Sequence, residues 1–154
     1  MIYWFTGQPG HGKTTLAKAL INQLKRGGYS PYHVDGDDMR ELTTNKDYSR
    51  TGREANIRRA QNIAQFLHSK GDVVVVSLVS PYREIREELK SSTDVCEIYV
   101  HTKEIRGKES RHVEGFEAPL NNFLDVNTTD MGVEDCITKI LEAHPIPSKE
   151  LKTL

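Results

Sequence analysis

Apolar residues recur along this chain in two patterns, which are short unbroken runs and longer stretches with apolar positions three to four residues apart. Unbroken runs are typical of strands buried on both faces, and the wider spacing is typical of amphipathic helices. The clearest run is the valine series at residues 73–76, and the clearest helical spacing falls within residues 52–69. The two patterns alternate along the chain.

This alternation predicts an α/β fold with three layers, a five-stranded parallel sheet with helices on both faces. We expect one domain at residues 1–143, and a loosely attached tail at residues 144–154. Ligands of such sheets bind at the carboxyl ends of the strands. The expected strands are residues 2–6, 31–35, 73–76, 95–100 and 123–126, and the expected helices are residues 15–25, 52–69 and 133–143, plus one capped by Ser80 that starts at Pro81.

The first expected strand runs directly into a glycine-rich segment at residues 7–14 that matches the phosphate-loop pattern G-x-x-x-x-G-K-[ST]. Backbone N–H groups of such a loop and the start of the next helix surround anionic oxygens. A chance glycine-rich turn is the alternative, but strand, loop and helix fall in the required order. We expect Lys13 to reach the β- and γ-phosphates and Thr14 to bind Mg²⁺. The expected ATP contacts are Gly7, Gln8, Pro9, Gly10, His11, Gly12, Lys13, Thr14 and Thr15.

Three carboxylates, Asp35, Asp37 and Asp38, follow the second expected strand. They should repel one another unless a Mg²⁺ ion or a basic group lies nearby. Asp35 is a candidate ligand of Mg²⁺, and Asp37 is a candidate base that accepts a proton from an attacking hydroxyl group. The alternative is an acidic turn that only caps the next helix.

Four arginines, Arg50, Arg53, Arg58 and Arg59, cluster near the start of the long expected helix. The helix dipole disfavours cations there, so the cluster suggests an anionic partner such as phosphate or sulfate. The alternative is a solvated helix face on which Glu54 and Arg58 form an ion pair.

Overall composition narrows the class of partner. Among 154 residues, 21 basic and 22 acidic side chains nearly balance, so neither nucleic acid nor an anionic membrane is expected as a partner. No apolar run approaches 18 residues, so we expect no membrane span. Cys96 and Cys136 lack metal-type spacing and predict reduced thiols in a cytoplasmic protein. Small-molecule nucleotides are the expected partners, with a homodimer also considered.

Taken together, these segments resemble adenylyl-sulfate kinases, which use ATP to make 3′-phosphoadenylyl sulfate from adenylyl sulfate. The resemblance rests on the phosphate loop and on residues 35–40, 47–59 and 77–83, and it resumes over residues 117–141. It implies ATP and Mg²⁺ as cofactors, with Lys13 and Asp37 as catalytic residues and Thr14 and Asp35 serving the metal. The implied acceptor contacts are Asp37, Arg40, Tyr48, Arg53, Asn56, Ser80, Pro81, Tyr82 and, in the lid, Phe116; Arg106 is the implied lid contact for ATP.

The chain also departs from the family pattern. Asp38 and Gly52 replace an asparagine and an acid, and residues 103–118 are clearly shorter than the family's lid. The shorter lid leaves open a second hypothesis, in which the same chemistry acts on a different nucleotide-like or modified-base hydroxyl acceptor. A third hypothesis is a non-catalytic nucleotide-binding module. Retention of Lys13, Thr14, Asp35 and Asp37 together argues against it, since a pure binder needs no acid on the acceptor side.

Overall fold

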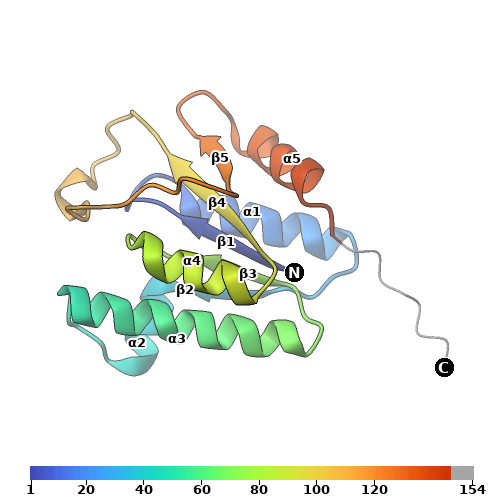
Figure 1. Cartoon of the computed structure of the whole chain (residues 1–154). Helices are drawn as coiled ribbons and strands as arrows, with labels where there is room; N and C mark the ends of the chain where they lie inside the picture. Colours follow the sequence, from blue (N-terminus) through green and yellow to red (C-terminus); the bar gives the residue numbers. More distant parts are fainter. Residues whose placement is uncertain (147–154) are drawn as a thin grey trace.

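The computed structural model describes residues 1–146, which form a five-stranded parallel sheet with helices on both faces (Figure 1). The three-layer α/β fold expected from the sequence pattern is therefore confirmed. In sheet order the strands are β2 (Tyr32–Asp35), β3 (Val74–Ser77), β1 (Ile2–Thr6), β4 (Val95–His101) and β5 (Leu124–Asn127). The α-helices are α1 (Lys13–Arg26), α2 (Gly36–Thr43), α3 (Arg50–Ser69), α4 (Arg83–Ser92) and α5 (Val133–Ala143). Most of the expected tail, residues 147–154, lies outside the described residues.

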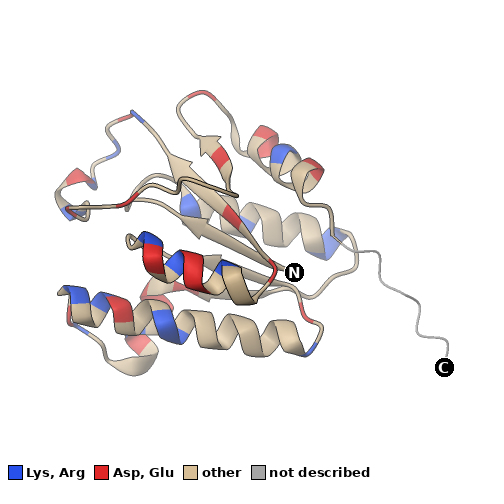
Figure 2. Cartoon of the chain, in the orientation of Figure 1, with Lys and Arg blue, Asp and Glu red and all other residues tan. Residues whose placement is uncertain are grey.

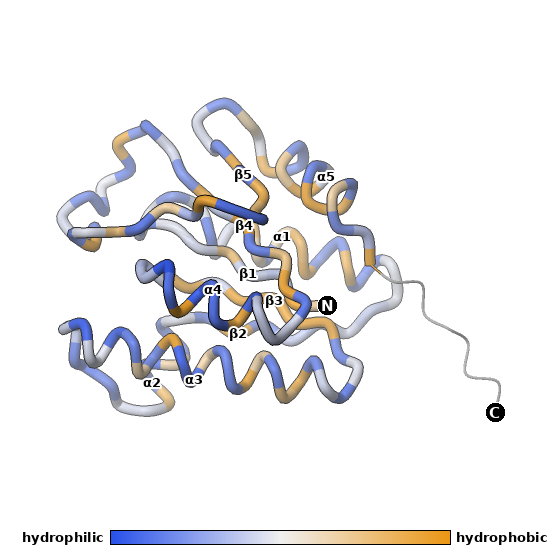
Figure 3. The backbone as a smooth tube through the Cα atoms, in the orientation of Figure 1, coloured by the Kyte–Doolittle hydropathy of each residue, from blue (hydrophilic) through white to orange (hydrophobic). Residues whose placement is uncertain are grey.

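The central strand β1 is buried on both of its faces. Tyr3 and Phe5 pack with α1 and α5, whereas Ile2 and Trp4 pack with α2, α3 and α4. In Figure 3 the strand β3 is orange, whereas the helices alternate between blue and orange along their length. Burial on two faces explains why β1 and β3 read as unbroken apolar runs rather than as alternating ones.

Because all the strand pairs are parallel, the carboxyl ends of the strands meet at one edge of the sheet. The loops that follow β1 and β4 extend from this edge, opposite the N-terminus (Figure 1). β3 continues one residue beyond the valine run because Ser77 pairs with Phe5 and Asp35 on its two sides. The edge brings together the phosphate loop and the acidic segment, as a ligand site there requires.

The start of α4 differs from the expectation. The helix begins at Arg83 with Tyr82 at its N-cap position, so the predicted cap at Ser80 and start at Pro81 are wrong. Ser80 instead has a φ of +46°, and the Trp4 indole N–H donates to its hydroxyl at 3.1 Å. This left-handed conformation is incompatible with the extended backbone of an N-cap residue.

The start of α3 lies two residues earlier than expected, at Arg50, with Ser49 as its cap. Gly52 lies in the first turn, where a Cβ atom would come within 2.1 Å of the Asp47 carbonyl oxygen. The segment before the helix therefore folds back onto position 52, and this contact explains why glycine replaces a larger residue there. Asn45 strengthens the contact by donating its side-chain amide to the Gly52 carbonyl at 2.9 Å.

Charges of both signs are interspersed on the helices in the view of Figure 2. Across residues 1–146, none of the helices has the length and apolar character needed to cross a membrane.

Candidate active site

Glycines shape the loop between β1 and α1. Gly12 has a φ of +105° and lies at the N-cap position of α1. Gly7 lies against β4, where a Cβ atom would come within 2.2 Å of the Val100 carbonyl oxygen. The first N–H groups of α1 have no partner within the helix. The loop can therefore approach an anion with its backbone at the positive end of the helix dipole.

Lys13 is the first residue of α1 and is only 8% exposed. Its ammonium donates to the carbonyl of Gln8 at 2.9 Å. Burial lowers the pKa of Lys13 to about 8, although the negative charges of Asp35 and Asp37 raise it. A buried cation gains when an anion replaces its lost hydration, and a phosphate oxygen would do so.

His11 lies in the same positive field. Burial lowers the pKa of His11 to about 4, and the nearby charges of His112, Lys13 and Arg106 act in the same direction. The imidazole is therefore neutral near pH 7, while Lys13 and Arg106 leave the loop electropositive. An electropositive concavity lined by backbone N–H groups is suited to a polyphosphate.

Thr14 and Asp35, the residues expected to serve Mg²⁺, lie together at the edge of the sheet. The Thr14 hydroxyl is 3.5 Å from Oδ1 of Asp35, which also accepts from the Ser77 hydroxyl at 2.7 Å. Hydroxyl and carboxylate oxygens are the donors that Mg²⁺ prefers, so these residues fit the ion. Within residues 1–146 no cluster of three or more His, Cys, Asp or Glu could hold a metal. An ion held here would take its remaining ligands from phosphate oxygens and water.

The two interpretations of the acidic segment coexist. Asp35 caps α2 by accepting from the backbone N–H of Asp37 at 3.1 Å, and it also lines the ligand cavity described next. Capping fixes the Asp35 carboxylate and places Asp37 in the first turn of α2.

A cavity of about 680 Å³ lies between the phosphate loop, α2, α3 and the lid, defined as residues 103–118. This volume is typical of small-molecule sites. The expected site residues that line it are Pro9, Gly10, Lys13, Thr14, Asp35, Asp37, Arg40, Tyr48, Arg53, Asn56, Ser80 and Pro81. The lid contributes Lys108, Ser110, Arg111, His112 and Val113. Expected site residues outside the lining are Gly7, Gln8, His11, Gly12, Thr15, Tyr82, Arg106 and Phe116.

Side chains build the part of the cavity that faces the phosphate loop. The Arg40 guanidinium lies 4.1 Å from the centre of the Tyr48 ring and donates to the Asp47 carbonyl at 2.9 Å. Asn56 is 3% exposed, and its Oδ1 atom has no hydrogen-bond partner among the described residues. A buried carbonyl oxygen without a partner is rare and costly, so Asn56 is a candidate for ligand contact.

The arginines of α3 serve different purposes. Arg50 pairs with Glu54 at 2.8 Å, and Arg58 pairs with Glu88 at 2.9 Å. The predicted pair of Glu54 with Arg58 is therefore wrong. Arg53 lines the cavity, which leaves its charge available to an anionic ligand.

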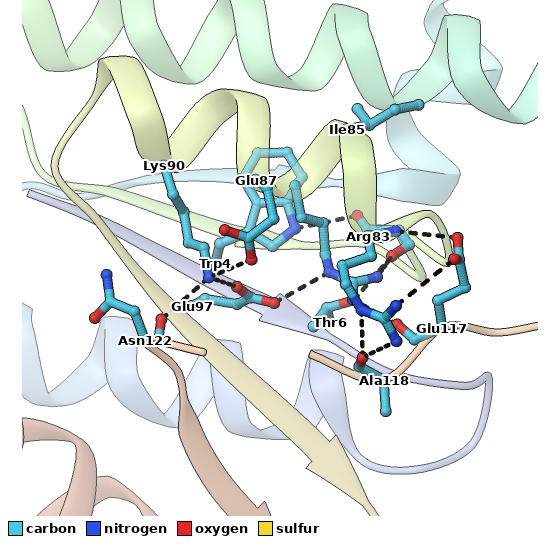
Figure 4. A network of polar contacts seen from close by, with 12 residues as sticks. Trp4, Thr6, Arg83, Ile85, Glu87, Lys90, Glu97, Glu117, Ala118 and Asn122 are labelled. Carbon is cyan, nitrogen blue, oxygen red and sulfur yellow. Dashed lines mark hydrogen bonds and ion pairs between the residues drawn. The ribbon is translucent and has the colours of Figure 1, made fainter. Parts of the chain in front are cut away.

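A buried ion network, drawn in Figure 4, contacts the backbone of Ser80, which lines the cavity. Arg86 pairs with Glu97 at 3.1 Å, with both side chains at most 3% exposed, and donates to the Ser80 carbonyl at 2.6 Å. Lys90 contacts the other carboxylate oxygen of Glu97. The Ser80 hydroxyl accepts from Trp4, which fixes this residue at the wall of the cavity that it lines.

The same side of α4 fixes the end of the lid (Figure 4). Arg86 donates to the Glu117 carbonyl, and the Arg83 guanidinium donates twice to the Ala118 carbonyl, at 3.0 and 2.8 Å. The Glu117 N–H donates to the Pro81 carbonyl at 2.9 Å. The lid therefore ends on a rigid support.

Three of the expected ligand contacts outside the lining bind groups of the protein itself. Arg106 donates to the His11 carbonyl at 3.3 Å and so touches the phosphate loop from outside the cavity. Phe116 stacks on Tyr99 with ring centres 6.0 Å apart, and Arg50 covers the Tyr82 ring at 4.3 Å. The two aromatic rings pack against the protein's own side chains in this conformation.

Two contacts of the loop were not foreseen from the sequence. Gln8 uses its side-chain amide to bind Val113 in the lid, and the Thr128 hydroxyl donates to the His11 carbonyl at 2.9 Å. Gln8 lies within a recognised motif, but nothing local to it indicates a partner 105 residues away. No sequence pattern of the kind used above marks Thr128.

A phosphate loop on β1, a Thr–Asp pair suited to Mg²⁺ and a second carboxylate facing the same cavity define a P-loop kinase. The adenylylsulphate kinase family model matches residues 1–119, more than half of the chain. The chain belongs to this family, which confirms the resemblance stated above.

Individual relatives agree with this assignment. The adenylyl-sulfate kinase of Chloroflexus aurantiacus is 34% identical over 163 residues, covering 93% of this chain and 88% of the relative. The adenylyl-sulfate kinase of Picosynechococcus is 35% identical over 159 residues and covers 90% of each chain. The solved structure of the Mycobacterium tuberculosis APS kinase CysC in complex with AMPPNP and APS aligns with a TM-score of 0.80 at 24% identity, covering 92% of this chain and 95% of that one. At this identity the last comparison supports the fold.

Proposed function

We propose that this protein transfers the terminal phosphoryl group of ATP to the 3′-hydroxyl of adenylyl sulfate. One observation carries the proposal: a single cavity is lined by Lys13 of the phosphate loop on one side and by Asp37 and Arg53 on the other. Membership of the adenylylsulphate kinase family supports the pair of substrates.

The chemistry follows from the two sides of the cavity. Lys13 would exchange the Gln8 carbonyl for the β- and γ-phosphates and stabilise charge on the transferred group. Mg²⁺, when bound beside Thr14 and Asp35, supplies further neutralisation of the phosphate oxygens. Asp37 accepts the proton of the acceptor hydroxyl as its oxygen bonds to the γ-phosphorus and the bond to ADP breaks.

The acceptor's charged group would bind among Arg40, Arg53 and Asn56. Arginine binds phosphate and sulfate oxygens with two parallel N–H donors, and the Asn56 amide can orient a neighbouring hydroxyl. Tyr48 would stack against the acceptor base. Each of these contacts is a proposal supported by the position of the side chain at the cavity.

A second candidate function keeps the chemistry and changes the acceptor. Tyr48 is 62% exposed, and the rings of Phe116 and Tyr82 pack away from the cavity. A base held by few enclosing groups is discriminated weakly from other bases. This openness favours a broader range of nucleotide-like acceptors than a fully enclosed pocket would accept.

Turnover with a panel of acceptors tests both candidates. We expect purified protein with Mg²⁺ and ATP to convert adenylyl sulfate to 3′-phosphoadenylyl sulfate, with only modest preference over cytidine- and guanosine-based analogues. Absence of activity with adenylyl sulfate together with activity on another acceptor would establish the second candidate. If the protein binds ATP but phosphorylates none of the acceptors, both candidates would be wrong and the protein would be a non-catalytic nucleotide-binding module.

We also propose that the protein works in the cytoplasm. Cys96 and Cys136 are both buried and unpaired, and burial raises the pKa of the Cys96 thiol to about 12, which keeps it protonated and unreactive. Buried reduced thiols are usual in a reducing compartment. Self-association as a homodimer stays a prediction.

A further inference from the structure

The Gln8 side chain belongs to the phosphate loop but is bound to the lid. Its amide nitrogen donates to the Val113 carbonyl at 2.9 Å, and its amide oxygen accepts from the Val113 N–H at 2.8 Å. A glutamine amide offers a donor and an acceptor in one plane. Here both are used by the backbone of one lid residue, much as a neighbouring strand would use them.

The two ends of the lid are fixed by other contacts. At one end the Lys103 N–H donates to the Thr129 hydroxyl at 2.8 Å, and at the other Arg83 binds the Ala118 carbonyl (Figure 4). Between these ends, the Gln8–Val113 pair joins the middle of the lid to the phosphate loop. The lid is mainly hydrophilic along its length (Figure 3), so little apolar burial holds it down.

The position of Val113 decides what faces the nucleotide. The neighbouring lid residues Lys108, Arg111 and His112 line the cavity. The Lys108 stem lies against the loop, since a Cβ atom on Gly10 would come within 3.0 Å of its Cβ. The His112 ring packs edge-on against the His11 ring, with ring centres 5.0 Å apart. The Nε2 atom of His112 is buried without a hydrogen-bond partner among residues 1–146.

We propose that Gln8 is a positioning residue that latches the lid over bound nucleotides, so that phosphoryl transfer goes to the acceptor rather than to water. This inference rests on the proposed function. Gln8 acts through Val113 and not on the reacting atoms. Its carbonyl accepts from Lys13 at 2.9 Å until Lys13 exchanges this bond for the phosphates, so the latch itself depends only on the Gln8 side chain. An unlatched lid would admit water and allow ATP hydrolysis.

Hydrogen exchange at the Val113 amide tests the latch without using activity. Gln8→Leu keeps the approximate size of the side chain and removes both hydrogen bonds. Loss of two ordinary hydrogen bonds should raise the opening equilibrium of the lid by about tenfold or more. We expect the Val113 amide to exchange faster by that factor, and the core Val75 amide to be unaffected. Unchanged exchange at Val113 would overturn the latch.

Gln65→Leu is the matched control. It removes the side-chain amide bonds from Gln65 to the Thr93 hydroxyl at 2.9 Å and to the Ser92 hydroxyl at 3.5 Å, between α3 and the end of α4. We expect Val113 exchange to match that of the wild type in this variant. Gln8→Met provides a second test if Gln8→Leu does not fold, because its unbranched side chain keeps the length of glutamine and has no amide to bond the Val113 backbone; it should also speed exchange.

The positioning role needs a kinetic readout. We expect the ratio of ATP hydrolysis to phosphoryl transfer, measured with saturating adenylyl sulfate, to rise several-fold in Gln8→Leu and to stay constant in Gln65→Leu. Faster exchange with an unchanged ratio would overturn the positioning role. A wild-type protein inactive on adenylyl sulfate would refute the proposed function, while the exchange measurement would still decide the latch.

Discussion

The two sides of the cavity are built by different means. On the phosphate side, the loop at residues 7–14 supplies backbone N–H groups, a buried lysine and the start of α1. On the acceptor side, Asp37, Arg53 and Asn56 come from α2 and α3, and the Ser80 turn comes from the end of β3. The first side depends on local backbone shape, and the second on side chains brought together by the fold.

This difference indicates which side of the cavity can change its specificity by substitution. A backbone nest binds any polyphosphate and tolerates little substitution at its glycines. Side-chain contacts can be replaced one at a time, so specificity for the acceptor can change while ATP chemistry is kept. The departures from the family pattern at Asp38, Gly52 and the short lid all lie outside the phosphate loop.

The largest effect should come from the phosphate side. We expect Lys13→Ala to lower phosphoryl transfer by about a thousandfold or more, because it removes the cation that stabilises charge on the transferred group. Lys18→Ala, an exposed lysine on the same helix, should behave as wild type. Steady-state kinetics with each variant decide the matter, and near-normal turnover by Lys13→Ala would refute a kinase mechanism based on this loop.

A smaller effect with a different signature should come from Asp37. Asp37→Asn should lower kcat by about a hundredfold and leave ATP affinity nearly unchanged, because the carboxylate acts on the acceptor hydroxyl. Asp38→Asn is the control, since Asp38 is exposed and does not line the cavity. If ATP affinity falls together with kcat, Asp37 belongs to the metal and the division between the two sides is incorrect.

Arg53 should affect binding of the acceptor alone. We expect Arg53→Ala to raise the acceptor KM by about tenfold or more, since a charge-assisted hydrogen bond contributes about 1.5–3 kcal/mol. Arg58→Ala removes an arginine that pairs with Glu88 on the outer face and should leave KM unchanged. If the two variants have equal acceptor KM values, Arg53 does not bind the acceptor and is only a solvated surface charge.

The smallest effect concerns pH and the phosphate side. Because burial lowers the pKa of Lys13 to about 8, its charge is lost as pH rises through that value. ATP affinity should then fall by roughly fourfold between pH 7 and pH 8.5, with a proton taken up on binding at the higher pH. Calorimetry in buffers of different ionisation enthalpy measures this uptake. Lys13→Arg should show none, because arginine stays charged.

Lys13 also makes a small contribution to the pH dependence of stability. Its pKa is lower in the folded protein than the ordinary value of 10.5, so the unfolded chain binds more protons between about pH 8 and 10.5. The contribution of this group to the free energy of unfolding therefore rises with pH across that window and is least favourable below it.

Features of the fold that depend on contiguous residues can be predicted from the sequence, whereas features that depend on distant contacts cannot. The five strands and the phosphate loop follow from runs of residues that are contiguous, so their positions are right to within one or two residues at most ends. The start of α4 was missed because Ser80 is held in a left-handed conformation, in which its hydroxyl accepts from Trp4, 76 residues away in sequence. The contact of Gln8 with Val113 was missed for the same reason, since it depends on where the fold delivers the lid.

The position of β1 in the sheet has a consequence for biosynthesis. β1 is made first, but its partners β3 and β4 begin only at Val74 and Val95. At about 5–20 residues per second, several seconds of translation separate this apolar strand from its neighbours. We expect nascent chains that stop before β4 to remain sensitive to protease and to depend on chaperones, whereas chains that include β4 gain protection. Of the five strands, the one that leads into the phosphate loop therefore has the longest interval between its own synthesis and that of its partner strands.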